Sequence, residues 1–106
     1  MDPEVLTLGE ISSALLGNSY LASVVGWISD KELGVKFLAN DIHQETRVTY
    51  SIVTPILNRL VTVDLITRHE RMPTSGTRGP LPYSRNDHPF WRPYGELCRM
   101  IIESSK

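Results

Sequence analysis

Apolar residues recur every three or four positions through most of this chain, which is the spacing of helices that bury one face. The first such segment covers about residues 6–16 and stops at Gly17 and Asn18. A second helix is expected after Ser19, its N-cap, and a third, short helix over residues 35–43. The residues predicted to face inward from these helices are Leu8, Ile11, Leu15, Leu16, Leu21, Val24, Val25, Ile28, Val35, Leu38 and Ile42.

The segment from Ser51 to Ile66 has the clearest helical pattern. Its apolar stripe consists of Val53, Ile56, Leu57, Leu60 and Val61. With Ser51 as N-cap, Pro55 falls at the end of the first turn, where a proline removes one backbone hydrogen bond, so we expect the helix to survive. Residues 44–50 form the predicted polar turn before it.

Two short strands are expected next, over residues 65–72 and 81–85. Pro80 and Pro82 flank the glycine-containing tip between them, which suits an exposed edge strand. A helix followed by a ribbon with a basic tip is the layout of a winged helix-turn-helix. That layout places one helix in the DNA major groove and a basic loop against the flanking backbone.

A last helix begins near Pro89 and has a broad apolar face. This face, which extends to Ile102, is larger than one small domain can cover, and that favours a two-fold dimer contact. Packing against the chain's own first helix is the alternative, and both can hold. The predicted dimer interface consists of Phe90, Trp91, Tyr94, Leu97, Cys98 and Ile101.

These elements predict one α+β domain over residues 1–106. The fold is a winged helix-turn-helix with an extra N-terminal helix (1–18) and a C-terminal dimerisation helix (88–106). Between them lie a helical core that contains the helix-turn-helix (19–66) and the wing (67–86).

Composition points to a cytoplasmic protein with no membrane association. No apolar run approaches the roughly 18 residues that a spanning helix needs. The acidic start, Met1 to Glu4, lacks the basic residues of a signal peptide. The single cysteine, Cys98, excludes an intrachain disulfide and fits a reducing compartment.

Charge is distributed unevenly along the chain, although its net value is only −1. Residues 1–34 carry a net charge of −4 and residues 67–106 a net charge of +3, with five arginines from Arg68 to Arg92. A protein with one basic face can bind DNA locally without a high isoelectric point. The plainer interpretation is that these arginines only solubilise the surface.

Residues opposite the apolar stripe of the fourth helix are the candidate readers of DNA. Asn and Arg are frequent bidentate readers of bases, and Ser and Thr bind phosphates. The candidates are Arg47, Thr49, Tyr50, Ser51, Thr54, Pro55, Asn58 and Arg59 on this helix and before it, and Arg71, Arg78, Gly79 and Arg85 on the wing. A surface helix that binds only another protein is the alternative.

Other chemistry has little support in the sequence. Trp27 and Trp91 are candidate residues for a pocket that holds a flat, hydrophobic effector, although tryptophans at helical spacing are commonly core residues. His43, His69 and His88 lack partners at metal-ligand spacing, so we expect no metal or other cofactor. No catalytic motif is visible, so we expect no enzyme.

Residues 19–103 resemble the PadR-type transcriptional regulators. Thr54-Pro55 stands where the family usually has Tyr-Pro, Ile56 to Leu60 follows in step, and Asp64-Leu65-Ile66 replaces Gly-Leu-Ile. Gly34-Val35 and residues 83–85 resemble further family segments. The departures, which include Val61 to Val63 where acidic residues are usual, suggest a divergent member or a neighbouring ArsR- or MarR-like protein. The resemblance implies a homodimeric repressor, sometimes relieved by a small aromatic effector.

Overall fold

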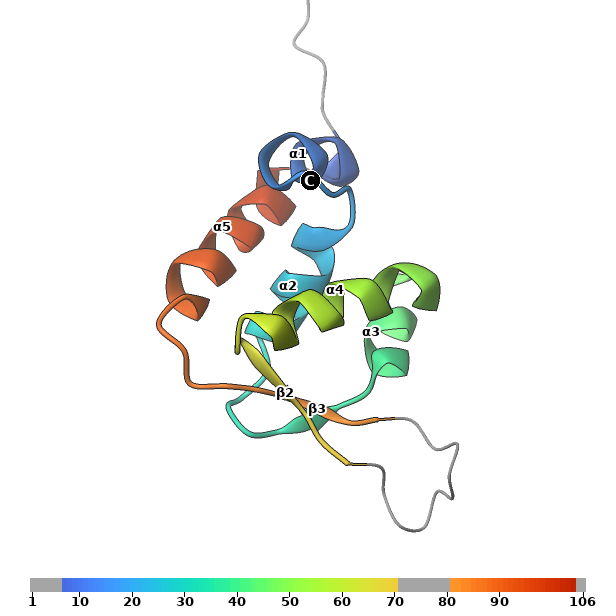
Figure 1. The fold of residues 1–106 in the computed structure, drawn as a ribbon. Helices are drawn as coiled ribbons and strands as arrows, with labels where there is room; N and C mark the ends of the chain where they lie inside the picture. The colour runs from blue at the N-terminus through green and yellow to red at the C-terminus, as the bar shows by residue number, and fades with distance from the viewer. Residues whose placement is uncertain (1–6, 71–80, 105–106) are drawn as a thin grey trace, which may run out of the picture.

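The computed structural model describes residues 7–70 and 81–104. In these ranges the chain forms an α+β fold of five helices and one three-stranded antiparallel sheet (Figure 1). This confirms the predicted class and is compatible with a winged helix. The helices are α1 (Leu8–Leu16), α2 (Leu21–Ser29), α3 (Ala39–Thr46), α4 (Tyr50–Thr62) and α5 (Trp91–Ser104), and the strands are β1 (Lys36–Phe37), β2 (Ile66–Arg68) and β3 (Tyr83–Arg85).

α1 begins and ends on local signals. The side chains of Thr7 and Glu10 form a capping box at its start, and Gly17 ends it with a φ of 73°. The predicted stop is therefore confirmed. Leu15, expected to face inward, is instead 62% exposed, because α1 buries the side that carries Ser12.

Ser12, which is fully buried, joins α1 to α2. Its hydroxyl accepts a hydrogen bond from the backbone N–H of Ala22 at 3.1 Å and donates one to the carbonyl of Asn18 at 2.6 Å. The N-cap of α2 is Tyr20, so the prediction that Ser19 caps this helix is wrong. Ser12, on the preceding helix, accepts the N–H of Ala22 in the first turn of α2. The spacing of residues within α2 alone cannot predict this contact.

α2 is the central helix of the core. Leu21, Val24, Val25 and Ile28 are all buried, as predicted. Within the described part of the chain, α2 contacts each of the other four helices. Its contact with α5 is especially close: a Cβ on Gly95 would lie 2.9 Å from the Cβ of Ser29, and a Cβ on Gly26 would lie 2.6 Å from Cδ1 of Ile102.

The predicted helix over residues 35–43 is wrong in its first half. Lys36 and Phe37 form β1 and pair with Ser84 and Tyr83 of β3. The helix begins only after Leu38, whose backbone N–H donates to Oδ2 of Asp41 at 2.8 Å. A partner strand distant in sequence thus overrides the local pattern. α3 then extends to Thr46, through residues that were predicted to be a turn.

α4 begins two residues earlier than expected, at Tyr50, with Thr49 rather than Ser51 as N-cap. Pro55 therefore lies inside the helix. The helix survives the proline, as predicted, and ends at Thr62. Its apolar stripe is buried, except that Val61 is half-buried.

A Schellman motif ends α4. The N–H of Leu65 donates to the carbonyl of Leu60 at 3.0 Å, the N–H of Asp64 donates to the carbonyl of Val61 at 3.1 Å, and Asp64 has a φ of 63°. The chain then enters β2, which pairs antiparallel with β3, and β3 lies between β1 and β2. β2 ends at Arg68, before its predicted end, whereas β3 begins two residues later than predicted and ends at Arg85 as predicted. Arg71 and Met72 lie outside the described residues.

No single helix in the described ranges is long and apolar enough to cross a membrane. α1 and α2 reach the required length and composition only as a pair, and that pair is bent by 92°.

We predict that Ser12→Ala destabilises the fold by about 1–3 kcal/mol, because it leaves a buried N–H and a carbonyl without their partner. Urea unfolding measures this loss. Ser13→Ala is the matched control, since Ser13 is the exposed neighbour on the same helix and should change stability by less than about 0.5 kcal/mol. Equal effects of the two substitutions would contradict the capping role of Ser12.

Candidate nucleic-acid interface

One side of α4 is exposed along its whole length and carries mainly hydrogen-bonding side chains. Pro55, Arg59 and Thr62 lie on the exposed part of the helix, and α4 contains no acidic residue. The structure brings together all the residues predicted for this region: Arg47, Thr49, Tyr50, Ser51, Thr54, Pro55, Asn58 and Arg59 are all exposed.

The turn between α3 and α4 has a defined geometry. Arg47 has a φ of 66° and its backbone N–H donates to the carbonyl of His43 at 2.8 Å, which ends α3. The ring of His43 stacks on the ring of Tyr50 at 5.0 Å between centroids. The hydroxyl of Tyr50 in turn donates to Oδ1 of Asn40. These contacts fix the angle between the two helices and leave the Arg47 side chain exposed.

The N-terminus of α4 has free donors. Among the described residues, no side chain caps it, since the hydroxyl of Thr49 contacts that of Ser51 at 3.1 Å. The carbonyl of Thr49 is occupied by the N–H groups of Ile52 and Val53. In the described part of the chain no group accepts the N–H groups of Tyr50 and Ser51, which lie at the end of a 13-residue helix whose dipole attracts anions.

Arg68 of β2 belongs to this surface, although the sequence did not single it out. Its guanidinium donates to Oδ1 of Asn58 and lies 5.8 Å from the ring centre of Tyr83. Asn58 and Arg68 are ten residues apart and meet because the turn at Asp64 folds β2 back beside α4. Alternation gave no signal for this contact, because Ile66 is buried and both Thr67 and Arg68 are exposed.

The predicted wing residues do not form one group with α4 in the described part of the chain. Arg71, Arg78 and Gly79 lie outside the described residues. Arg85 is half-buried on the α5 side of the sheet. Its Nε donates to the carbonyl of Lys31 at 2.9 Å, and its guanidinium lies 5.5 Å from the ring centre of Trp91.

The two tryptophans line different pockets. Trp27 is half-buried against Phe37, its indole N–H donates to Glu45, and Lys31 lies 4.1 Å from its ring centre. Trp91 is 5% exposed, and its indole N–H donates to the carbonyl of Leu65 at 2.8 Å. The structure therefore does not bring them together as one effector pocket in a single chain.

The predicted dimer residues of α5 divide between two faces. Trp91, Cys98 and Ile101 are buried against the protein's own helices, and Tyr94 is half-buried. Phe90 precedes the helix and is 60% exposed, and Leu97 is 38% exposed. The alternative that α5 packs within its own chain therefore accounts for most of the predicted stripe, because α5 contacts both α1 and α2.

Burial changes the acidity of two groups on α5. Desolvation raises the pKa of the Cys98 thiol to about 11. Desolvation likewise raises the pKa of Tyr94 to about 12, with an added contribution from Cys98 and an opposing one from Arg59. A buried, protonated thiol behaves as a small apolar group and reacts slowly.

The described residues contain no group of three or more His, Cys, Asp or Glu side chains that could hold a metal ion. No protein-family model, curated protein or solved structure matches this chain.

We predict that stability falls between about pH 9 and about pH 11 and that Cys98 causes part of the fall. The folded pKa is raised, so the stability is complete below pH 9 and is lost as pH rises towards 11. The loss is at most about 3 kcal/mol. Urea unfolding across this range should give a shallower pH dependence for Cys98→Ala. Tyr94→Phe is the control, because it should alter the profile mainly above pH 10. Parallel profiles for all three proteins would refute the assignment.

Proposed function

We propose that this protein binds double-stranded DNA and regulates transcription as a dimeric repressor in the cytoplasm, by occupying its operator. The observation that carries the proposal is the exposed side of α4. It presents Ser51, Thr54, Asn58 and Arg59, contains no acidic residue, and has N–H groups at its leading end that no described residue accepts. This is the chemistry that reads base edges and holds phosphates.

The order of the elements supports this proposal. From α2 to β3 the chain has the helix, strand, helix, helix, strand, strand order of a winged helix (Figure 1). In that arrangement α3 and α4 form the helix-turn-helix, and α4 is the recognition helix. Asp64 adds to the resemblance to PadR-type regulators, since it has a positive φ at the position where those proteins usually have glycine.

Arginines lie around the exposed side of α4. Arg47 lies in the turn before the helix, Arg59 lies on its last turns, and Arg68 lies beside Asn58. We propose that Asn58 reads a base and that Arg68 holds its amide in one orientation. Arg47 and the N–H groups of Tyr50 and Ser51 would then hold the phosphates at the entry of the groove.

DNA binding is tested by titrating the protein against duplexes from its own promoter region at several salt concentrations. Affinity should fall steeply as salt rises. Asn58→Ala should weaken the preferred site by about 1–3 kcal/mol and relax discrimination at one base position. Arg47→Gln should instead weaken binding to all sequences evenly. It should also lower the slope of log affinity against log salt by about one, the value for one lost phosphate contact.

Arg99→Gln is the control for charge alone. It removes one positive charge from α5, where Arg99 lies 3.3 Å from Asp30, and it should change neither specificity nor the salt dependence. Failure of the protein to bind any duplex at low salt would favour the alternative, a module that binds only other proteins.

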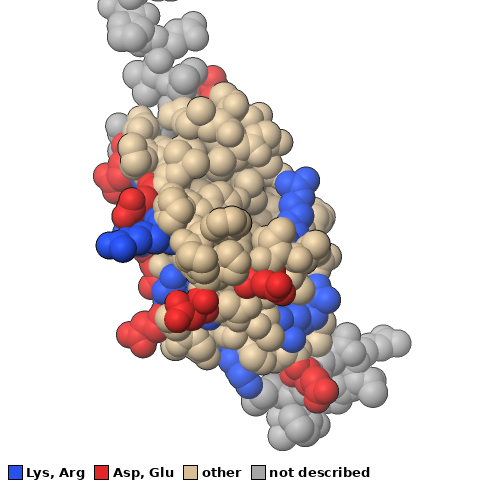
Figure 2. Space-filling view, turned by 60° about the vertical axis from the view of Figure 1, so that its left-hand side comes forward, with Lys and Arg blue, Asp and Glu red and all other residues tan. Residues whose placement is uncertain are grey.

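The outer side of α5 supports a homodimer. Phe90, Pro93, Leu97 and Met100 are exposed at three- and four-residue spacing, and Met100 is 66% exposed. Figure 2, which turns the α5 side forward, shows a broad surface without Lys, Arg, Asp or Glu and with charged side chains at its edges. Exposed apolar patches of this kind mark contact surfaces, and a second copy of α5 presents a matching one across a two-fold axis.

We predict that Leu97→Glu produces a folded monomer, because Leu97 lies on the outer side of α5. Sedimentation gives the oligomeric state and circular dichroism shows the fold. Ile101→Glu is the matched control, four residues away on the inner side and only 2% exposed, and should unfold the protein. A Leu97→Glu protein that remains a dimer would show that the contact surface lies elsewhere.

A further inference from the structure

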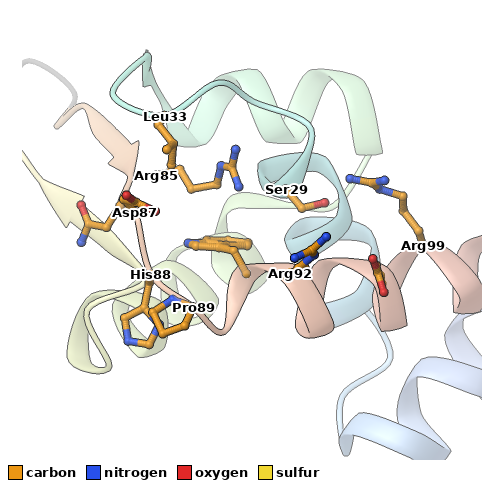
Figure 3. Close-up of a pocket in the computed structure, with 11 residues that line it drawn as sticks. Ser29, Leu33, Arg85, Asp87, His88, Pro89, Arg92 and Arg99 are labelled. Atoms are coloured by element: carbon orange, nitrogen blue, oxygen red, sulfur yellow. The ribbon is translucent and has the colours of Figure 1, made fainter.

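A pocket of about 570 Å³ lies between β3, α5 and the end of α2 (Figure 3). Its volume is within the range of small-molecule sites. Arg85 enters it from β3, Arg92 and Arg99 enter it from α5, and Leu33 and Pro89 contribute apolar surface. None of these residues belongs to the exposed side of α4, so the pocket is separate from the proposed DNA-binding surface.

The pocket contains an arginine that no described residue pairs with. Three arginines line it, against the two carboxylates of Asp87 and Glu96. Arg99 is partly neutralised outside the pocket by Asp30, at 3.3 Å. Arg92, by contrast, makes no hydrogen bond or ion pair with any residue in the described ranges. The formal charges of these six groups balance, and Arg92 is the lining arginine whose guanidinium is left open to a ligand.

The Arg85 guanidinium is held in place on this wall. Its Nε donates to the carbonyl of Lys31, and its Cζ lies 5.5 Å from the ring centre of Trp91. Nε is thus occupied, and the terminal nitrogens remain as donors for a ligand. The buried indole beside them is a low-polarity wall, which strengthens the attraction between a guanidinium and an anion. A held guanidinium loses less conformational entropy on binding than a free one.

We propose that this pocket binds a small organic carboxylate, with its carboxylate between Arg85 and Arg92 and a short apolar part against Leu33 and Pro89. Arginine binds a carboxylate through two parallel N–H donors, which favours this group over a spherical anion. The mixed polar and apolar lining favours an organic acid over an inorganic ion.

The proposal is tested by titrating the protein with butyrate while amide and indole N–H signals are followed by nuclear magnetic resonance. We expect saturable shifts at the Trp91 indole and at Leu33 and Arg92. Butyramide, which has the same shape without the charge, should bind at least about tenfold more weakly. Inorganic phosphate at the same ionic strength should also bind more weakly.

Arg92→Gln should weaken butyrate binding about tenfold without unfolding the protein, because Arg92 is exposed. Arg47→Gln, which removes an arginine from the turn before α4, should leave it unchanged. Equal binding of butyramide or phosphate, equal effects of the two substitutions, or shifts that spread over all arginines without saturating would each overturn the proposal. The titration contains no DNA, so its result is independent of the DNA-binding proposal.

Discussion

The close packing of α2 against α5 is the contact on which the rest of the structure depends. A Cβ on Gly95 would come within 2.9 Å of the Cβ of Ser29, so the two helices meet at a distance that only a glycine allows there. Gly26 makes room for Ile102 one turn away. Glycine inside a helix costs roughly 1 kcal/mol relative to alanine. Burial of α2 among the other four helices of the described chain offsets that cost.

This position of α5 determines how the sheet and α4 are connected. With α5 against α2, the Trp91 indole reaches the carbonyl of Leu65, which also accepts the backbone N–H of Asn86 at 3.0 Å. The side chain of Asn86 donates to the carbonyl of Asp64 and accepts from the hydroxyl of Thr67. The end of α4, the start of β2 and the approach to α5 are therefore one hydrogen-bonded junction, which fixes the exposed side of α4 relative to α5.

Periodicity predicted the parts of the fold that one helix determines by itself. The buried stripes of α2 and α4, and hence the exposed side of α4, follow from spacing alone. β1 and the inward turn of Arg85 were missed, because both depend on partners distant in sequence. The side of α5 that faces the core stayed open for another reason. This helix is apolar on two sides, and spacing does not say which side faces the core. Gly95, on the side of Trp91 and Cys98, was the available signal.

The three sides of α5 therefore have different roles in the proposals made above. The inner side packs on α2, the outer side is left for a second copy, and the side that carries Arg92 lines the pocket beside β3. Because β3 is the central strand and its Arg85 lines the same pocket, a ligand there would contact both the sheet and the proposed dimer helix. Such a ligand would couple to DNA binding only if it favoured one placement of these two elements over another. The junction at Leu65 argues for a small coupling, since Trp91 already ties α5 to the sheet without a ligand.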